Sequence, residues 1–188
     1  MATATQPQTK LMTAEEFIAA DLGEGTFELV RGEVIEVPPP MPVHGRVCGN
    51  AFFVLETYGR QSGRGYGLTN DTAVVTERGP DTVRGADVAF YGHARWPRSE
   101  VGKKVPPVPP DLAVEVYSPS NRRGALSKKV AEYLSVGTIM VWVSYPASRS
   151  VAIHSSDDQP PLVLHAGGVI ENLPELPGFR CAVADFFV

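Results

Sequence analysis

The sequence lacks the features of secreted, membrane-spanning and disulfide-stabilised proteins. In its 188 residues no apolar run approaches the roughly 20 residues that cross a bilayer, and the polar segment Met1–Lys10 has no apolar core of a secretion signal. The only cysteines, Cys48 and Cys181, lie far apart with no ligand-like spacing, which disfavours a disulfide framework or a zinc site. We therefore expect a cytoplasmic protein with reduced thiols and no membrane partner.

The sequence also has no internal repeats and no change in composition that would mark a domain boundary after residue 11. Hydrophobic residues make up 43% and charged residues 20% of the chain, values that are ordinary for a globular domain with a buried core. We expect a disordered lead over residues 1–10 and a single domain over residues 11–188.

Charge is distributed unevenly, although the net charge is only −4. Residues 60–130 hold 12 of the 17 basic residues and 7 of the 21 acidic ones, a net charge of +5, which leaves −9 on the flanks. A locally basic middle suits one anionic ligand at one site. Chance clustering of surface charges is an equally good explanation.

Hydrophobic periodicity predicts an α+β fold in which helices cover a mixed central sheet. A capping box at Thr13 and Glu16 begins an N-terminal helix that ends near Gly23, and residues 27–37 form a β-hairpin. A helix follows over residues 44–58. The next segments are a glycine-rich loop (59–67), strands (67–75 and 83–91), a proline-rich loop (93–110), a strand (111–117), a helix (122–135), a buried strand (139–145) and a closing hairpin (150–154 with 162–165).

Two acids interrupt strands that otherwise have buried sequences. Asp87 lies in Gly-Ala-Asp-Val-Ala-Phe and Glu115 in Leu-Ala-Val-Glu-Val-Tyr, each on the face opposite the bulky apolar residues. A buried carboxylate requires a charged partner or a metal ion. If the two strands are neighbours, both acids open on one side of the sheet. One such acid alone would be better explained by an edge strand.

Helical phase distinguishes two adjacent lysines on the predicted helix 122–135. At about 100° per residue, Lys129 lies roughly 60° from Leu126 in the apolar stripe, whereas Lys128 lies roughly 200° away. Lys128 is expected in solvent. Lys129 either extends its ammonium to water along the sheet or reaches the two acids as part of a site.

These residues, in this order and spacing, resemble the Uma-type restriction endonucleases, a branch of the PD-(D/E)XK nuclease superfamily. The resemblance covers nearly all of residues 11–188 and implies a restriction endonuclease-like fold. The matching segments are 12–17, 27–33, the proline-rich turn to His44, 86–88, 110–116, 118–120, Lys129 with Tyr133, 141–143 and 176–179.

The family's active-site pattern carries over onto Asp87, Glu115 and Lys129. Glu28 matches an acidic position that completes a metal site, and His44 matches a histidine at the start of the first long helix. Tyr117 stands where many nucleases of the superfamily have the lysine that Lys129 replaces in this branch.

Two further positions depart from the branch. Ala125 replaces its usual aspartate, which removes any role for that acid. The strand Ile139–Trp142, which ends in Tyr145-Pro146, replaces the usual Glu-Tyr-Trp ending in Asp-Pro, and we expect this change to affect packing only.

The resemblance implies a metal-dependent endonuclease that hydrolyses phosphodiester bonds, with DNA the favoured substrate. Asp87, Glu115, the Val116 carbonyl and Glu28 would hold Mg²⁺, or Mn²⁺ in its place. Lys129 would orient water and stabilise the transition state, and Arg122 and Arg123, together with His44, would bind the nucleic acid. Simple solvation explains the two arginines equally well. Cleavage of both strands of a duplex favours a homodimer.

Two other functions are compatible with parts of this pattern. A catalytically inactive nuclease fold could bind nucleic acid or a protein partner, although Asp87, Glu115 and Lys129 are all retained. A hydrolase could use His154 or His165 with Asp157 or Asp158, but no nucleophile motif such as Gly-x-Ser-x-Gly accompanies them.

Overall fold

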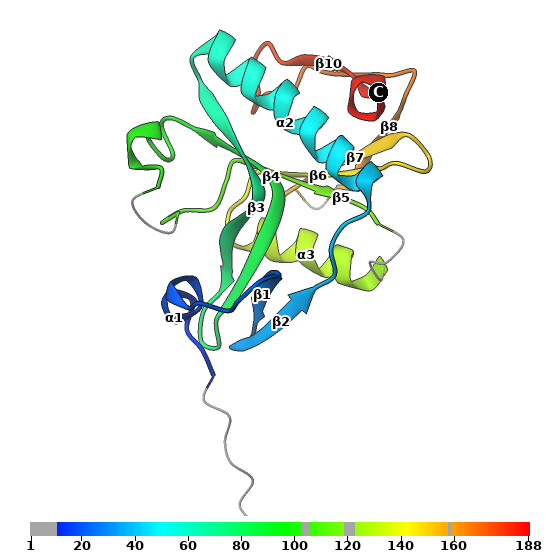
Figure 1. Ribbon diagram of the computed structural model, residues 1–188. Helices are drawn as coiled ribbons and strands as arrows, with labels where there is room; N and C mark the ends of the chain where they lie inside the picture. Colours follow the sequence, from blue (N-terminus) through cyan, green and yellow to red (C-terminus); the bar gives the residue numbers. More distant parts are fainter. Residues whose placement is uncertain (1–10, 103–105, 119–122, 158) are drawn as a thin grey trace, which may run out of the picture.

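The structure, a computed structural model, describes residues 11–102, 106–118, 123–157 and 159–188 (Figure 1). The predicted disordered lead, residues 1–10, lies outside these ranges. In the ranges that are described, no helix combines the length and apolar character needed to cross a membrane.

One mixed sheet forms the centre of the described chain. Its strand order is β2-β1-β4-β5-β6-β7-β8, with β3 paired to β4, and every pair is antiparallel except the parallel pair β5 and β6. The strands are β1 (Thr26–Val30), β2 (Glu33–Val37), β3 (Gly65–Glu77), β4 (Thr82–Gly92), β5 (Leu112–Val116), β6 (Met140–Tyr145), β7 (Ser150–Ser155) and β8 (Leu162–His165).

Helices cover the two faces of this sheet, as Figure 1 shows. The long helix α2 (Pro42–Ser62) packs Ala51 and Leu55 against Phe90 and Trp142 on one face. On the other face, α3 (Arg123–Ser135) connects the parallel strands β5 and β6. The remaining elements are α1 (Ala14–Ala19), β9 (Val169–Glu171), β10 (Arg180–Ala182) and the 3₁₀ turns Arg98–Glu100 and Val183–Phe187. The predicted α+β class, with an N-terminal helix and hairpin, is confirmed.

Several predicted element boundaries are wrong, and one has a clear physical reason. The glycine-rich loop expected over residues 59–67 does not exist, because α2 continues to Ser62 and β3 begins at Gly65. A Cβ at Gly59 would lie 2.5 Å from the Gly65 carbonyl oxygen. Gly59 therefore allows helix and strand to pack closely. The first helix also ends at Ala19, earlier than the predicted Gly23.

The edge of β4 that faces β1 and β5 is divided between these two strands. Leu29 of β1 pairs with Val83, and Val114 of β5 pairs with Val88. Between these pairings β1 and β5 diverge, so that residues 84–87 of β4 face an opening in the sheet. Because β1 and β5 diverge along β4, side chains from all three strands can reach the opening between them.

Candidate active site

A pocket of about 340 Å³ occupies this opening between β1 and β5. Elements from both halves of the chain contribute to it, namely β1, β2, the segment after β2, the start of α2, β3, β4, β5 and α3. Its lining includes all three residues of the predicted catalytic group. The charged and histidine side chains among the lining residues are Glu28, His44, Asp71, Arg84, Asp87, Glu115, Lys128 and Lys129.

Asp87 and Glu115 lie side by side on neighbouring strands, as the sequence predicted. One residue beyond the Val88–Val114 pair, Asp87 reaches opposite Glu115, and its Oδ2 accepts a 2.6 Å hydrogen bond from the Val116 amide. Glu115 is only 2% exposed, and its Oε1 accepts a 2.8 Å bond from the Tyr133 hydroxyl. Glu115 contacts Tyr133 and Lys129 of α3, whereas Asp87 contacts His44 at the start of α2.

Electrostatics around Glu115 favour its neutral form. Burial raises its pKa, Lys129 opposes that effect, and Asp87 adds to it, so that the net shift is upward. A divalent cation prefers oxygen ligands, and one bound here would favour the ionised form of Glu115.

Lys129 reaches the acids of the site, whereas Lys128 lies at the exposed rim of the pocket, so helical phase correctly distinguished the two lysines. The Lys129 Nζ lies 2.7 Å from Glu28 Oε1 and 3.4 Å from Glu115 Oε2. Although burial alone would lower its pKa, Glu115 and Glu28 raise it, so the ammonium stays charged. Lys128 has a side chain that is 56% exposed, and it forms a 3.6 Å ion pair with Glu132.

Glu28 enters the pocket from β1 and is bound on both of its oxygens. Oε2 accepts a 2.8 Å hydrogen bond from Arg84, and Oε1 accepts bonds from Lys129 and from the Gly85 amide. Burial raises the pKa of Glu28, but Lys129 and then Arg84 outweigh it, and the pKa is lowered. Arg84 is held in turn by Glu132 at 2.6 Å. Glu28 thus fixes the position of Lys129.

Asp71 is a fourth acid of the pocket that the sequence did not single out. It lies in a register shift of β3 between Thr69 and Thr72, where Asn70 and Asp71 have φ values of 69° and 54°. This bulge redirects the side chain toward the site. Burial and then Asp87 raise the pKa of Asp71. Gly85 accommodates the bulge, because a Cβ there would lie 2.8 Å from the Asp71 Cβ.

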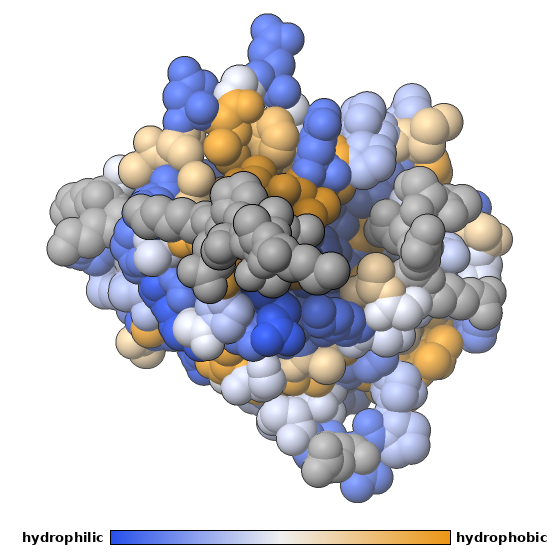
Figure 2. Space-filling model, turned by 90° about the horizontal axis from the view of Figure 1, so that it is seen from below, coloured by the Kyte–Doolittle hydropathy of each residue, from blue (hydrophilic) through white to orange (hydrophobic). Residues whose placement is uncertain are grey.

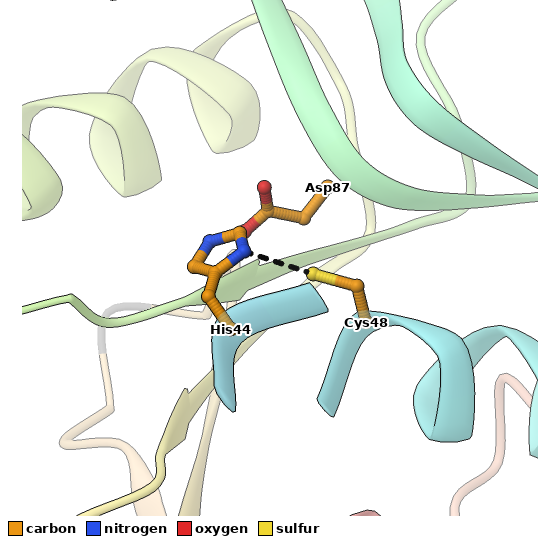
Figure 3. Close-up of side chains that lie close together, drawn as sticks. All are labelled: His44, Cys48 and Asp87. Carbon is orange, nitrogen blue, oxygen red and sulfur yellow. Dashed lines mark hydrogen bonds and ion pairs between the residues drawn. The ribbon is translucent and has the colours of Figure 1, made fainter. Parts of the chain in front are cut away.

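His44 and Cys48 approach Asp87 from the start of α2 (Figure 3). His44 Nε2 lies 3.2 Å from Asp87 Oδ2, and His44 Nδ1 lies 3.4 Å from Cys48 Sγ. The hydrogen bond to Asp87 raises the pKa of His44. His44 therefore contacts the predicted metal site directly, whereas the sequence assigned it to nucleic-acid binding.

The remaining predicted site residues are placed less completely. Arg122 and the side chain of Arg123 lie outside the described part of the structure, so their predicted contact with nucleic acid stays a prediction. The Val116 amide contacts Asp87, while the predicted role of its carbonyl remains a prediction. Arg84 and Tyr133 were not assigned to the site, although Tyr133 follows Lys129 by one helical turn. That spacing places Tyr133 on the same face of α3 as Lys129 and could have assigned it to the site.

The pocket lies beside apolar surface as well as charged surface. Ile35 and Val37 of the edge strand β2 line it, and Ile35 is 44% exposed. Seen from below, the molecule shows hydrophilic side chains across the middle of this face and hydrophobic patches on either side (Figure 2).

Among the described residues, no hydrogen bond or ion pair joins His154 or His165 to Asp157, one of the two acids predicted for the alternative site. His154 lies on β7 opposite Val141, and His165 lies on β8 opposite Ser150. The Asp157 carboxylate accepts its hydrogen bonds from Ser155 and Gln159 within its own loop. Asp158 is outside the described residues.

Comparison with known proteins agrees with this architecture. The structure is similar to the crystal structure of a putative nuclease belonging to DUF820 from Anabaena variabilis ATCC 29413, with a TM-score of 0.78 and 20% sequence identity, over 94% of this chain and 97% of that one. At this identity the similarity establishes the fold. No curated protein matches the chain. The family model of Uma2, described as "Putative restriction endonuclease", matches residues 14–184, and the chain therefore belongs to the Uma2 family.

Proposed function

We propose that this protein is a divalent-metal-dependent endonuclease that hydrolyses phosphodiester bonds of nucleic acid. The observation that carries this proposal is the convergence of Asp87, Glu115 and Lys129 in one pocket, from two neighbouring strands and the helix that follows them. Membership of a restriction endonuclease family supports the same reaction class.

Asp87 and Glu115 are the residues that would hold the metal ion, with Mg²⁺ preferred and Mn²⁺ able to replace it. A bound ion would polarise a phosphate oxygen and lower the pKa of a ligated water. The pair fits this role because both side chains offer oxygen and lie on neighbouring strands, with Glu115 buried. The Val116 carbonyl, at the end of β5, would add a neutral oxygen.

The other residues position these groups and balance charge. The Lys129 ammonium would orient the attacking water and stabilise the negative charge that develops on the phosphate. Glu28 holds that ammonium at 2.7 Å, and the Tyr133 hydroxyl holds the Glu115 carboxylate at 2.8 Å. We propose that Glu28 acts on the metal site through Lys129, because both of its oxygens already accept bonds from the protein.

DNA is the favoured substrate, with Arg122 and Arg123 on its phosphates. Both arginines precede or begin α3, whose later residues line the pocket. Cleavage of both strands would require two sites, which a homodimer supplies by symmetry.

The decisive assay compares wild-type protein with Glu115→Gln on plasmid, single-stranded DNA and RNA, with Mg²⁺ or Mn²⁺. We expect metal-dependent cleavage by the wild type and none by the variant, while Lys128→Gln retains full activity. Equal activity of wild type and Glu115→Gln would refute the site. Retention of nucleic acid without any cleavage would instead support the inactive, binding form of the fold.

A further inference from the structure

A second group of atoms that could ligate a metal ion lies where the start of α2 meets Asp87. His44 and Cys48 are four residues apart on α2 and therefore point in the same direction, toward Asp87 on β4 (Figure 3). One ligand atom from each of the three residues can be chosen such that all lie within 4.8 Å of one another. One nitrogen, one sulfur and one oxygen ligand atom are thus close enough to approach the same ion.

We propose that His44, Cys48 and Asp87 form a binding site for a thiophilic divalent cation of the zinc class. Thiolate and imidazole are the ligands that zinc prefers, whereas Mg²⁺ takes oxygen ligands. The site would therefore select a different metal from the Asp87–Glu115 pair, although it shares Asp87 with that pair.

The spacing of the helical ligands suits such an ion. With zinc–sulfur and zinc–nitrogen bonds of about 2.3 and 2.0 Å at a tetrahedral angle, the two ligand atoms are about 3.5 Å apart. His44 Nδ1 and Cys48 Sγ are 3.4 Å apart. Asp87 Oδ2 lies 3.2 Å from His44 Nε2, so a small rotation of either side chain would bring its carboxylate to the same ion as a third ligand. Three protein ligands leave a fourth position for water or a substrate oxygen.

The surroundings of Cys48 favour a bound cation as well. The side chains of His44 and Asp87 are only 13% and 11% exposed, and Cys48 is partly buried. The Cys48 sulfur lies 3.4 Å from the imidazole of His44, so both helical ligand atoms face the same space. The sequence disfavoured zinc because Cys48 and Cys181 are unrelated in spacing, and the structure supplies histidine and aspartate as the partners of Cys48.

Sharing of Asp87 has a consequence for catalysis, and this consequence alone rests on the proposed function. A zinc-class ion on His44, Cys48 and Asp87 would withdraw a ligand from the Mg²⁺ pair. We expect it to weaken Mg²⁺ binding and thereby to inhibit cleavage.

Titration of the metal-free full chain with Co²⁺, in a thiol-free reductant, tests the site independently of activity. The wild type should develop thiolate-to-cobalt charge-transfer absorption that saturates at one equivalent and disappears when Zn²⁺ is added. Cys48→Ser should lose this absorption and bind Zn²⁺ at least about 100-fold more weakly, since loss of a ligand exceeds the effect of losing a supporting partner. Cys181→Ser is the matched control and should behave as the wild type does.

Glu115→Gln separates this proposal from the proposed nuclease function, because it removes the Mg²⁺ pair and should keep the cobalt absorption. On the wild type, Zn²⁺ should also protect Cys48 from alkylation, read by mass spectrometry, which does not require a folded variant. Absence of the absorption in the wild type, its persistence in Cys48→Ser, or unprotected alkylation of Cys48 would overturn the proposal and leave an ordinary sulfur–imidazole hydrogen bond.

Discussion

The two sides of the pocket each hold a buried glutamate, yet their electrostatic states are opposite. On the β1 side, Glu28 is surrounded by Arg84, Lys129 and the Gly85 amide, and its pKa is lowered. On the β5 side, burial and Asp87 raise the pKa of Glu115, and Lys129 opposes them only in part. The two residues are 7% and 2% exposed, so the contrast does not come from burial alone.

This contrast indicates different roles for the two glutamates, with Glu115 binding a metal ion and Glu28 positioning Lys129. The protein's own cations satisfy Glu28, which therefore has little need of an added ion. Burial and then Asp87 raise the pKa of Asp71 as well as that of Glu115, so a divalent cation on this side would favour the ionised forms of both acids. We infer that a metal ion binds on the β5 side and that the β1 side holds Lys129 in place.

Among the substitutions considered, Glu115→Gln should have the largest effect on Mg²⁺ binding and cleavage. It removes a proposed metal ligand while its amide can still accept from Tyr133, so Mg²⁺ affinity should fall at least about 100-fold and cleavage should cease. Metal-free stability should not fall, because a neutral side chain suits this position. Calorimetric titration and thermal unfolding with and without Mg²⁺ check both parts. A variant that binds Mg²⁺ normally would break the comparison.

Lys129→Gln should lower kcat by about 100- to 1000-fold, because it removes positive charge near the phosphate in the transition state. Mg²⁺ binding should persist or become tighter, since a competing cation leaves Glu115. Lys128→Gln is the matched control on the adjacent, exposed position and should change kcat little. Equal losses in the two variants would show that only general charge matters.

Glu28→Gln should affect stability more than metal binding. It removes one of the two carboxylates that each of Arg84 and Lys129 contacts, and the free energy of unfolding should fall by about 2 kcal/mol. Mg²⁺ affinity should remain within about tenfold of the wild type, the range for a supporting residue. Denaturant unfolding and calorimetry measure the two quantities. Loss of Mg²⁺ binding equal to that of Glu115→Gln would make Glu28 a ligand.

The pKa values of the two glutamates are shifted in opposite directions, so their contributions to the pH dependence of folding stability have opposite signs. Between the unfolded and folded pKa values of Glu115, the unfolded chain has released a proton that the metal-free fold retains, so metal-free stability falls as pH rises. Mg²⁺ displaces that proton, and the rise in Tm that it causes should grow with pH above the ordinary carboxyl range. Thermal unfolding of the wild type and Glu115→Gln across pH tests this, and the variant should lose the trend.

Local patterns predicted the parts of the site that depend on one element. The acids within apolar strands identified Asp87 and Glu115 as pocket residues, and helical phase separated Lys129, which contacts Glu115, from the exposed Lys128. The contacts between distant elements were not predictable in this way. Asp71 depends on a bulge, and the Arg84 network depends on the divergence of β1 from β5. Gly59 was mistaken for a loop residue because close packing and turns both require glycine.

Calorimetric Mg²⁺ titration of the wild type, Glu115→Gln and Glu28→Gln tests the central claim most directly. We predict one Mg²⁺ site in the wild type, no measurable binding in Glu115→Gln and retained binding in Glu28→Gln. Retained binding in Glu115→Gln together with its loss in Glu28→Gln would contradict the assignment of the metal ion to the β5 side of the pocket.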